Sequence, residues 1–249
     1  MNRPRFSIIV PCRNEAAQIA GTLDAIARAR WTASPSSSEV IVVANGCTDG
    51  TLALLARRAD PGLSIAVSRA GSAPAARNEG ARLATGEVLV FVDADTHVPA
   101  EALRALEAHM ARGYKAGIFA LGPQEDRLRA RLFFAFWNQV RRLPVPRAKA
   151  MPAFMFVTRE AFDGYGPFDE SCKIGEEWPI LAGLYRSEKG ALVYDRDVMA
   201  LTSSRRMELR RFGYARVLLR YAWAIVHESG RMDYPDTLRE DAAPRAGPP

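Results

Sequence analysis

The 249-residue sequence has only three cysteines and three histidines, and neither type is spaced as in a redox or metal-binding motif. We therefore expect Cys12, Cys47 and Cys172 to be small buried residues with reduced thiols, as in a cytosolic protein. His97 follows closely on an acidic motif, and we interpret it as a loop residue rather than a ligand. These shortages argue against a disulfide scaffold and against a zinc-centred function.

Long apolar runs, internal repeats and low-complexity segments are also missing. No stretch approaches the ~20 apolar residues of a membrane span, and the N-terminus shows no secretion signal, so we expect a cytoplasmic protein. No helix-turn-helix, RNA-binding or zinc-finger pattern occurs, so nucleic acid is not an expected partner. The first apolar run does not lead into Gly-x-Gly-x-x-Gly, which argues against a nucleotide-dependent oxidoreductase.

The sequence does contain short apolar runs that alternate with helical patterns. Hydrophobic residues make up 48% of the chain, which is ample for a large core. Alternation of strand and helix predicts parallel pairing through right-handed crossovers, and hence an α/β fold. The predicted strands are Arg5–Val10, Glu39–Val43, Leu63–Val67 and Val88–Val92; the helical repeats are Ala16 to Ala27, Leu52 to Ala56 and Leu103 to Met110.

Polar residues follow the predicted strands, and in a parallel sheet they fall on one rim, where open α/β sheets bind ligands. Asp93 and Asp95 come directly after Val88–Val92. Alternate residues of an extended chain point the same way, so the two carboxylates can converge on one hard cation and on the diphosphate that it neutralises. Asp-x-Asp is also common in solvated surface loops, and the motif by itself leaves that alternative open.

Five blocks, in order, resemble those of family 2 glycosyltransferases, nucleotide-sugar-dependent enzymes with the GT-A fold. The resemblance covers Phe6 to Gly190 and implies a Rossmann-like sandwich with a mostly parallel central sheet flanked by helices. It implies one domain over residues 1–230, with a nucleotide-binding half (1–98) and an acceptor half (99–230). The C-terminal residues 231–249 are rich in Pro, Gly, Ala and charged residues, which predicts a flexible tail. The blocks are Ser7–Glu15, Asn45–Thr51, Ala76–Gly80, Asp93–Asp95, and Phe162–Glu170 with Gly175–Trp178.

By this resemblance the donor is a UDP- or GDP-linked sugar, and a Mg²⁺ or Mn²⁺ ion bridges its phosphates. The implied donor-binding residues are Pro11, Asn14, Glu15, Asn45, Arg77, Asp93 and Asp95, with Asp95 and Asp93 holding the metal. Two of them have simpler explanations: Glu15 as a carboxylate at a helix N-terminus, and Arg77 as an exposed helix arginine. The family usually has two acids where this chain has Ala44-Asn45, which leaves the base unassigned.

The catalytic base implied by the resemblance is Glu177, with Glu176 as the second candidate. A carboxylate there would deprotonate the acceptor hydroxyl in an inverting transfer. The family more often has aspartate at this position. Alternatively, both acids simply open a helix over Pro179–Arg186. Trp178 either stacks on a sugar or packs in the core.

Net charge is +6, and the excess of arginine and lysine lies in three clusters of the second half. Residues 209–226 predict an amphipathic helix whose apolar stripe includes Phe212, Leu219, Trp223 and Val226, beside Arg216. Such a helix either docks on the domain or lies on an anionic bilayer, which would place the protein at the inner face of the membrane. Arg205, in a polar loop before this helix, is a candidate contact to the diphosphate or to a phosphorylated acceptor. We therefore favour a phosphorylated or lipid-linked acceptor.

Two other functions remain open from the sequence. A non-catalytic nucleotide-sugar-binding protein would keep the donor pocket without the base. A sugar nucleotidyltransferase would use similar donor chemistry and release pyrophosphate.

Overall fold

The computed structural model describes residues 3–33, 38–69, 71–149, 153–172, 174–188, 190–208 and 212–227. The tail predicted over 231–249 lies outside the described residues. The elements, in order, are β1 (Phe6–Cys12), α1 (Ile19–Ala33), β2 (Ser38–Asn45), α2 (Thr51–Ala56), β3 (Leu63–Ser68), α3 (Ala73–Leu83), β4 (Val88–Val92), β5 (Thr96–His97), α4 (Ala102–Ala111), β6 (Ala116–Pro123), α5 (Leu128–Val140), η2 (Pro146–Lys149), β7 (Phe154–Thr158), α6 (Arg159–Tyr165), α7 (Trp178–Ser187), β8 (Leu192–Thr202), α8 (Arg205–Glu208) and α9 (Gly213–His227).

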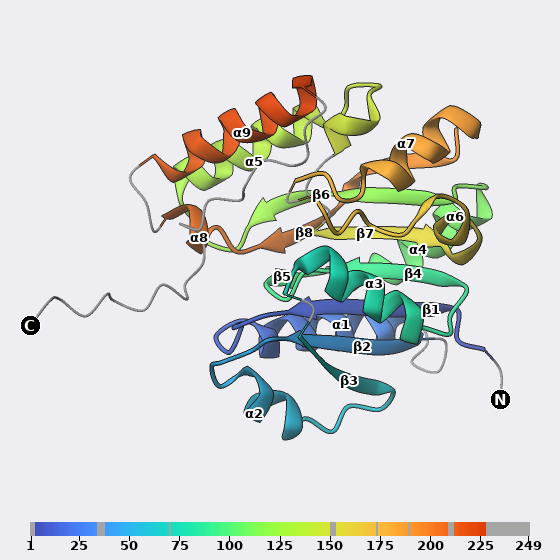
Figure 1. Ribbon diagram of the computed structural model, residues 1–249, viewed down its shortest axis with the longest axis vertical. Helices are drawn as coiled ribbons and strands as arrows, with labels where there is room; N and C mark the ends of the chain where they lie inside the picture. The colour runs from blue at the N-terminus through green and yellow to red at the C-terminus, as the bar shows by residue number, and fades with distance from the viewer. Residues whose placement is uncertain are drawn as a thin grey trace, which may run out of the picture.

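The strands form one sheet of eight in the order β3-β2-β1-β4-β7-β6-β8-β5 (Figure 1). Strands β3, β2, β1 and β4 are parallel, as the alternation of strand and helix predicts. Strand β7 runs antiparallel between β4 and β6, whereas β6 and β8 pair in parallel. Four of the seven strand pairs are parallel, and the sheet is flanked by helices, which confirms the predicted α/β class.

Helices cover both faces of the sheet, because alternate residues of each buried strand point to opposite sides. Ile8 and Val10 belong to a core shared with α1, α4 and α5, whereas Ile9 belongs to a second core with α3 and α7. Helix α3 lies so close to β1 that a Cβ atom at Gly80 would stand 2.4 Å from Cγ2 of Ile9. This close approach fixes the height of α3 above the sheet.

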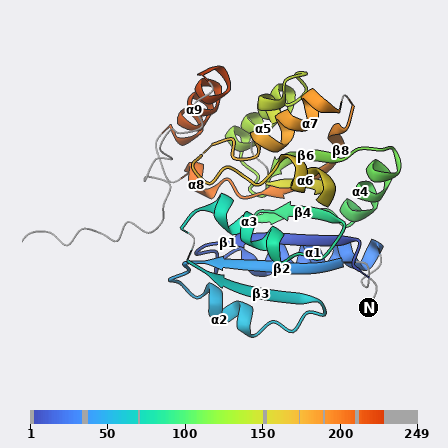
Figure 2. The ribbon, with the colours of Figure 1, turned by 45° about the vertical axis from the view of Figure 1, so that its right-hand side comes forward.

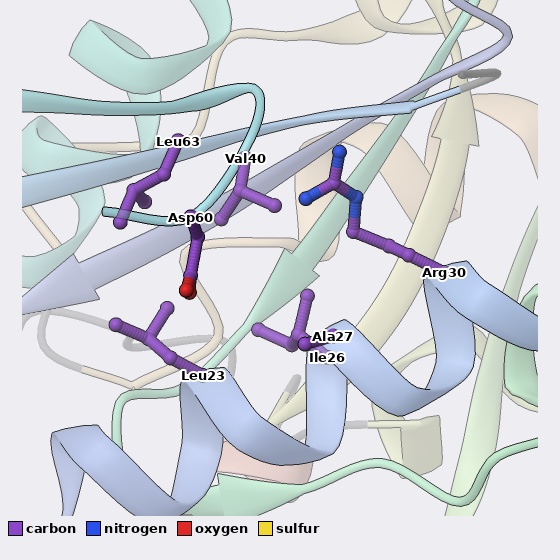
Figure 3. Close-up of a pocket in the computed structure, with 7 residues that line it drawn as sticks. All are labelled: Leu23, Ile26, Ala27, Arg30, Val40, Asp60 and Leu63. Atoms are coloured by element: carbon purple, nitrogen blue, oxygen red, sulfur yellow. The ribbon is translucent and has the colours of Figure 1, made fainter. Parts of the chain in front are cut away.

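A recess between α1 and strands β2 and β3 lies at the amino ends of those strands (Figure 3). The Arg30 side chain at its border donates to the Ser38 hydroxyl and to the carbonyls of Ser38 and Pro61, at 2.8–2.9 Å. The guanidinium is thus held by the chain itself. Because ligands of open α/β sheets bind at the carboxyl edge, this recess lies at the opposite edge from the candidate site.

Three smaller expectations need correction or qualification. His97 lies on β5, paired with Leu201 of β8, and not in a loop. All three cysteines are free, but only Cys12 is fully buried, and Cys47 and Cys172 are partly exposed. In the part of the chain that the structure describes, no helix combines the length and the hydrophobicity needed to cross a bilayer.

Candidate active site

The carboxyl ends of β1, β2 and β4 lie along one edge of the sheet, since the three strands are parallel and in register. The segments that follow them carry Asn14 and Glu15 after β1, Asn45 at the end of β2, and Asp93 and Asp95 after β4. Asn14 has a positive φ of 54°, a conformation that asparagine tolerates better than most residues. The predicted donor-site residues are therefore brought together at this edge. Pro11, within β1 opposite Val43, is partly exposed beside them.

Two of these side chains fasten loops to one another. The Asn14 amide oxygen accepts from the backbone N–H of Thr48 at 2.7 Å, and its nitrogen donates to the Thr48 hydroxyl at 3.1 Å. The Asn45 amide donates to the carbonyl of Ser72 at 2.8 Å and accepts from the N–H of Gly71 at 3.0 Å. Both asparagines therefore hold the loops at the rim of the site, and their side-chain amides are hydrogen-bonded to other residues of the protein.

Glu15 forms the centre of a charged cluster in this rim. Its carboxylate is buried and accepts from the guanidinium groups of Arg205 and Arg206, which belong to α8. Arg205 also lies 3.8 Å from a carboxylate oxygen of Asp95. A position at a helix N-terminus therefore does not account for the main contacts of Glu15. Through Arg205 and Arg206, the Glu15 carboxylate links the second half of the chain to the first.

The Asp95 carboxylate is largely enclosed. Its Oδ1 accepts from the Thr202 hydroxyl at 3.4 Å, and its backbone carbonyl accepts from the Gln124 amide at 2.8 Å. Burial raises the pKa of Asp95 to about 6, helped by the charges of Asp93 and Glu15 and opposed by Arg206 and Arg205. Concentrated negative charge of this kind favours a cation nearby. The surface-loop explanation of the Asp-x-Asp motif is therefore wrong for Asp95.

Arg77 links the donor side of the site to the segment before α7. Its guanidinium donates to Asp93 at 2.6 Å and to Glu176 at 2.7 Å. The residue is only 4% exposed, so the exposed-arginine alternative is wrong. The two carboxylates hold the charged form strongly and raise its pKa, despite the burial that opposes it. One planar fork thus joins residues that are 83 positions apart in the sequence.

Asn78, the next residue on α3, makes a second link that the sequence did not assign. Its amide nitrogen donates to the carbonyl of Phe168 and to Glu170, both at 2.9 Å, while its oxygen accepts from the N–H of Phe168. Glu125 is another: it accepts from Ser203 and Ser204 at 2.7–2.9 Å and anchors the loop before α8. Asn78 lies within the Ala76–Gly80 block that resembles the family's, whereas nothing in the sequence near Glu125 indicates its role.

Glu177 is fully buried, with 0% of its surface exposed. It is the N-cap residue of α7, yet its side chain makes no capping hydrogen bond. Among the described residues, neither of its carboxylate oxygens has a hydrogen-bond partner. Burial, with the charge of Glu176, raises the pKa of Glu177 to about 8. Opening the helix does not explain this side chain, because buried carboxylates are normally paired.

Trp178 packs in a small cluster with Ile174 and with Ala224 of α9, and it is mostly buried. Arg141, from one of the basic clusters, is also buried near Glu177 and Tyr194, and burial lowers its pKa to about 10. Lys149 of the same cluster is buried too, donating to the carbonyls of Arg141 and Leu143 at 2.7–2.8 Å. These two cations therefore belong to the interior and not to a solvated basic surface.

The sequence matches the family model of "Glycosyl transferase family 2" over residues 7–160. No curated protein sequence matches the chain. Four of the five blocks described above lie within the matched residues, whereas the block of Phe162–Glu170 with Gly175–Trp178 lies beyond them.

Solved glycosyltransferase structures share the fold. Residues 1–349 of TarS from S. aureus superpose with a TM-score of 0.63 at 19% identity, over 91% of this chain and 74% of that one. The mannosyltransferase PcManGT from Pyrobaculum calidifontis gives 0.65 at 23% identity, over 90% and 65%. Glucosyl-3-phosphoglycerate synthase from Mycobacterium tuberculosis gives 0.60 at 16% identity, over 89% and 80%. The chain thus spans about two-thirds of the length of PcManGT.

Proposed function

Because the chain belongs to glycosyl transferase family 2, we propose that it moves a sugar from a UDP- or GDP-linked donor to an acceptor hydroxyl, with inversion at the sugar carbon. The observation that carries this proposal is the Arg77 bridge, which holds Asp93 of the donor side and Glu176 beside the buried Glu177 in one structure. TarS has been solved with UDP and with UDP-GlcNAc, and PcManGT with GDP-Man, which supports a nucleoside-diphosphate sugar as donor.

On the donor side we assign the rim of β1, β2 and β4 to the nucleoside. Glu15 and Asp93 offer carboxylate oxygens to ribose or base hydrogen-bond donors, while Pro11, Asn14 and Asn45 shape the loops around them. Arg205 and Arg206 approach Glu15 and Asp95 from α8. Their guanidinium groups suit a diphosphate, because each presents parallel charged donors. We propose that they turn from the carboxylates to the phosphates when the donor binds.

The residues at this edge fit a divalent cation. No group of three metal-ligating side chains occurs among the described residues. Mg²⁺ and Mn²⁺ need fewer protein ligands when substrate phosphates complete the coordination. The buried, negatively surrounded carboxylate of Asp95, with Asp93 beside it, supplies the hard oxygen ligands required. Both PcManGT and the glucosyl-3-phosphoglycerate synthase were solved with Mn²⁺. When bound, such an ion would neutralise the charge of the leaving diphosphate.

On the acceptor side we propose Glu177 as the general base. Its carboxylate takes the proton of the acceptor hydroxyl, the acceptor oxygen bonds to the sugar carbon, and the bond from that carbon to the diphosphate breaks on the opposite face. A raised pKa makes Glu177 a stronger base once it is ionised. Because the side chain is covered in the free chain, we propose that the segment before α7 moves to admit the acceptor. Glu176, paired with Arg77, positions this segment.

We further propose a phosphorylated or lipid-linked acceptor, and a single domain in which residues 1–98 bind the donor and residues 99–230 form the acceptor side. Support comes from the placement of the residues themselves. The proposed donor ligands come from β1, β2, α3 and the end of β4, whereas Glu176 and Glu177 precede α7. The arginines of α8, from the second half of the chain, contact Glu15 and Asp95 of the first.

Thermal unfolding with UDP or GDP, with and without Mn²⁺, tests the donor site. A ligand at a hundred times its dissociation constant adds about 2.7 kcal/mol, which for a chain of this size raises the melting temperature by about 5–10 °C. We expect a Mn²⁺-dependent rise with one nucleotide that Asp95→Asn abolishes. The control Asp126→Asn removes a charge from a 91%-exposed side chain and keeps the rise.

Three results would contradict the proposal. An equal rise in Asp95→Asn and in the wild type would remove Asp95 from the donor site. Binding without turnover would favour a nucleotide-sugar-binding protein, and release of pyrophosphate in place of nucleoside diphosphate would favour a nucleotidyltransferase.

A further inference from the structure

Helices α5 and α9 lie side by side at one end of the molecule, beyond the half of the sheet formed by β6, β7 and β8 (Figures 1 and 2). Two ring pairs join them: Phe133 with Tyr214 at 5.4 Å, and Trp137 with Tyr221 at 5.4 Å. Helix α5 in turn packs on β6 through its buried residues. The two helices therefore form one layer, with α9 as its outer member.

Helix α9 docks through one face and leaves a second apolar face outside. The docked face includes Tyr214, Leu218 and Tyr221, which pack on the core, and Ala224, which packs on Trp178. The predicted stripe lies mostly on the other side of the helix: Phe212, Leu219 and Trp223 are exposed by 41–68%. The side chain of Val226 lies outside the described residues. The apolar stripe found in the sequence is thus mainly the outward face of the helix, which is substantially exposed.

Helix α5 also has an apolar outward stripe. Leu128, Leu132 and Phe136 recur at intervals of four, which places them on one side of the helix, and their exposed fractions are 50–71%. Single exposed apolar residues are common on protein surfaces, whereas larger contiguous apolar patches mark interaction sites.

The charge of the two helices indicates which kind of partner the surface would bind. Neither helix contains an Asp or Glu residue, whereas together they carry Arg129, Arg131, Arg216 and Arg220. The side chains of Arg129 and Arg131 are 60% and 66% exposed, although each also contacts an acidic side chain. An apolar stripe beside arginines, with no acidic residue in the helix, matches the interface of a bilayer with anionic headgroups.

The geometry points to a membrane-binding surface: we propose that the outward faces of α5 and α9 bind the surface of an anionic lipid bilayer, with the apolar stripes in the headgroup region and the arginines on the phosphates. The inner face of α9 contacts Trp178, the neighbour of Glu177. Resting on the function proposed above, this arrangement sets the acceptor side of the reaction next to the membrane, where a lipid-borne acceptor with a phosphorylated head would be presented.

Flotation with vesicles tests the surface without reference to activity. Vesicles of phosphatidylglycerol and phosphatidylcholine in equal parts are compared with vesicles of phosphatidylcholine alone. We expect the wild type to float with the anionic vesicles only. The double variant Leu219→Glu/Trp223→Glu should bind at least about tenfold more weakly, and Arg216→Gln about fivefold more weakly. The control Trp31→Glu changes a 79%-exposed tryptophan of α1 and should bind as the wild type does.

The experiments distinguish a surface that does not bind membranes from a protein that lacks the proposed function. Nucleotide binding by the double variant, measured by thermal unfolding, should equal that of the wild type and shows that the variant is folded. Equal flotation of the double variant and the wild type would overturn the surface, as would no flotation at all. So would a dimer of the wild type in sedimentation that the double variant loses, because the stripe would then join two copies of the chain.

Discussion

Replacing Glu177 by glutamine should stabilise the protein at neutral pH and at the same time abolish the proposed activity. The glutamine has nearly the same shape and is never ionised. The native carboxyl keeps its proton up to a pKa of about 8, whereas in the unfolded chain it loses the proton near its ordinary value of 4.5. Between these two values the unfolded state binds fewer protons, so the free energy of unfolding of the wild type falls as the pH rises.

The size of the effect follows from the same two values. Each pH unit above the ordinary pKa costs about 1.4 kcal/mol until the native pKa is reached. At pH 7, which lies 2.5 units above 4.5, this gives an upper bound of about 3–4 kcal/mol; the opposing charges of Arg77 and Arg141 are already part of the pKa of about 8. We therefore expect Glu177→Gln to be more stable than the wild type by about 1–3 kcal/mol at pH 7. A chain of this size gains about 2–4 °C in melting temperature for each kcal/mol.

Urea unfolding of both proteins at pH 5 and at pH 8 reports on Glu177 and on Glu176, whose charge acts on it, because groups farther away titrate alike in the two. The two stabilities should nearly coincide at pH 5 and separate at pH 8. Glu107→Gln, at an exposed position of α4, removes the same charge and should follow the wild type at both pH values. A stability difference that does not change with pH, or a variant less stable at pH 8, would refute the buried, unpaired state of Glu177.

Activity tests the role of the residue separately. Loss of a general base lowers kcat by about 10²- to 10⁴-fold. A stabilised variant with that loss shows that the buried carboxylate is kept at a cost to stability for the sake of the reaction. A stabilised variant that keeps its activity would leave the burial intact and remove Glu177 as the base.

Two further substitutions probe how α3 holds the site. Arg77→Lys replaces a guanidinium that donates to two carboxylates by a single ammonium group. This variant should lower the free energy of unfolding by about 1–3 kcal/mol and weaken donor binding. The control Arg82→Lys, at an exposed position of the same helix, should change neither. Gly80→Ala adds a Cβ 2.4 Å from Ile9 and should cost about 1–3 kcal/mol in urea unfolding despite the better helix propensity of alanine. Gly164→Ala, with no atom within 4 Å, should be neutral or stabilising, and an equal cost at both glycines would contradict the close approach of α3.

The first four main strands could be predicted because each is a short apolar run bounded by polar residues, and β4 occupies the predicted Val88–Val92. Strand β8 is different. It spans Leu192–Thr202 and includes Asp195, whose carboxylate accepts from the N–H groups of Asp197 and Val198 at a shift in the pairing with β6. A strand interrupted in this way shows neither an apolar run nor a regular alternation, so its local sequence gives no signal.

The orientation of α9 shows a second limit of sequence periodicity. The helix has apolar residues on opposite sides, Tyr214 and Tyr221 on one and Leu219 and Trp223 on the other. Periodicity identifies an apolar stripe but not the surface that it meets, and here the stripe found by pattern is mainly the outward one. Only the position of α5, through Phe133 and Trp137, decides which face docks.

Glu176 and Glu177 show why the chemistry of the site needed the fold. The sequence places two acids side by side before a helix, and nothing in the pattern separates them. In the fold Arg77, from α3, reaches only the first, at 2.7 Å, while the second turns into the interior without a hydrogen-bond partner among the described residues. The Glu176 carboxylate accepts a hydrogen bond from Arg77. The buried Glu177 has a raised pKa, and its carboxylate has no hydrogen-bond partner among the described residues. The proton abstraction that we propose requires the carboxylate without a partner, and the three-dimensional position of Arg77 is what distinguishes the two residues.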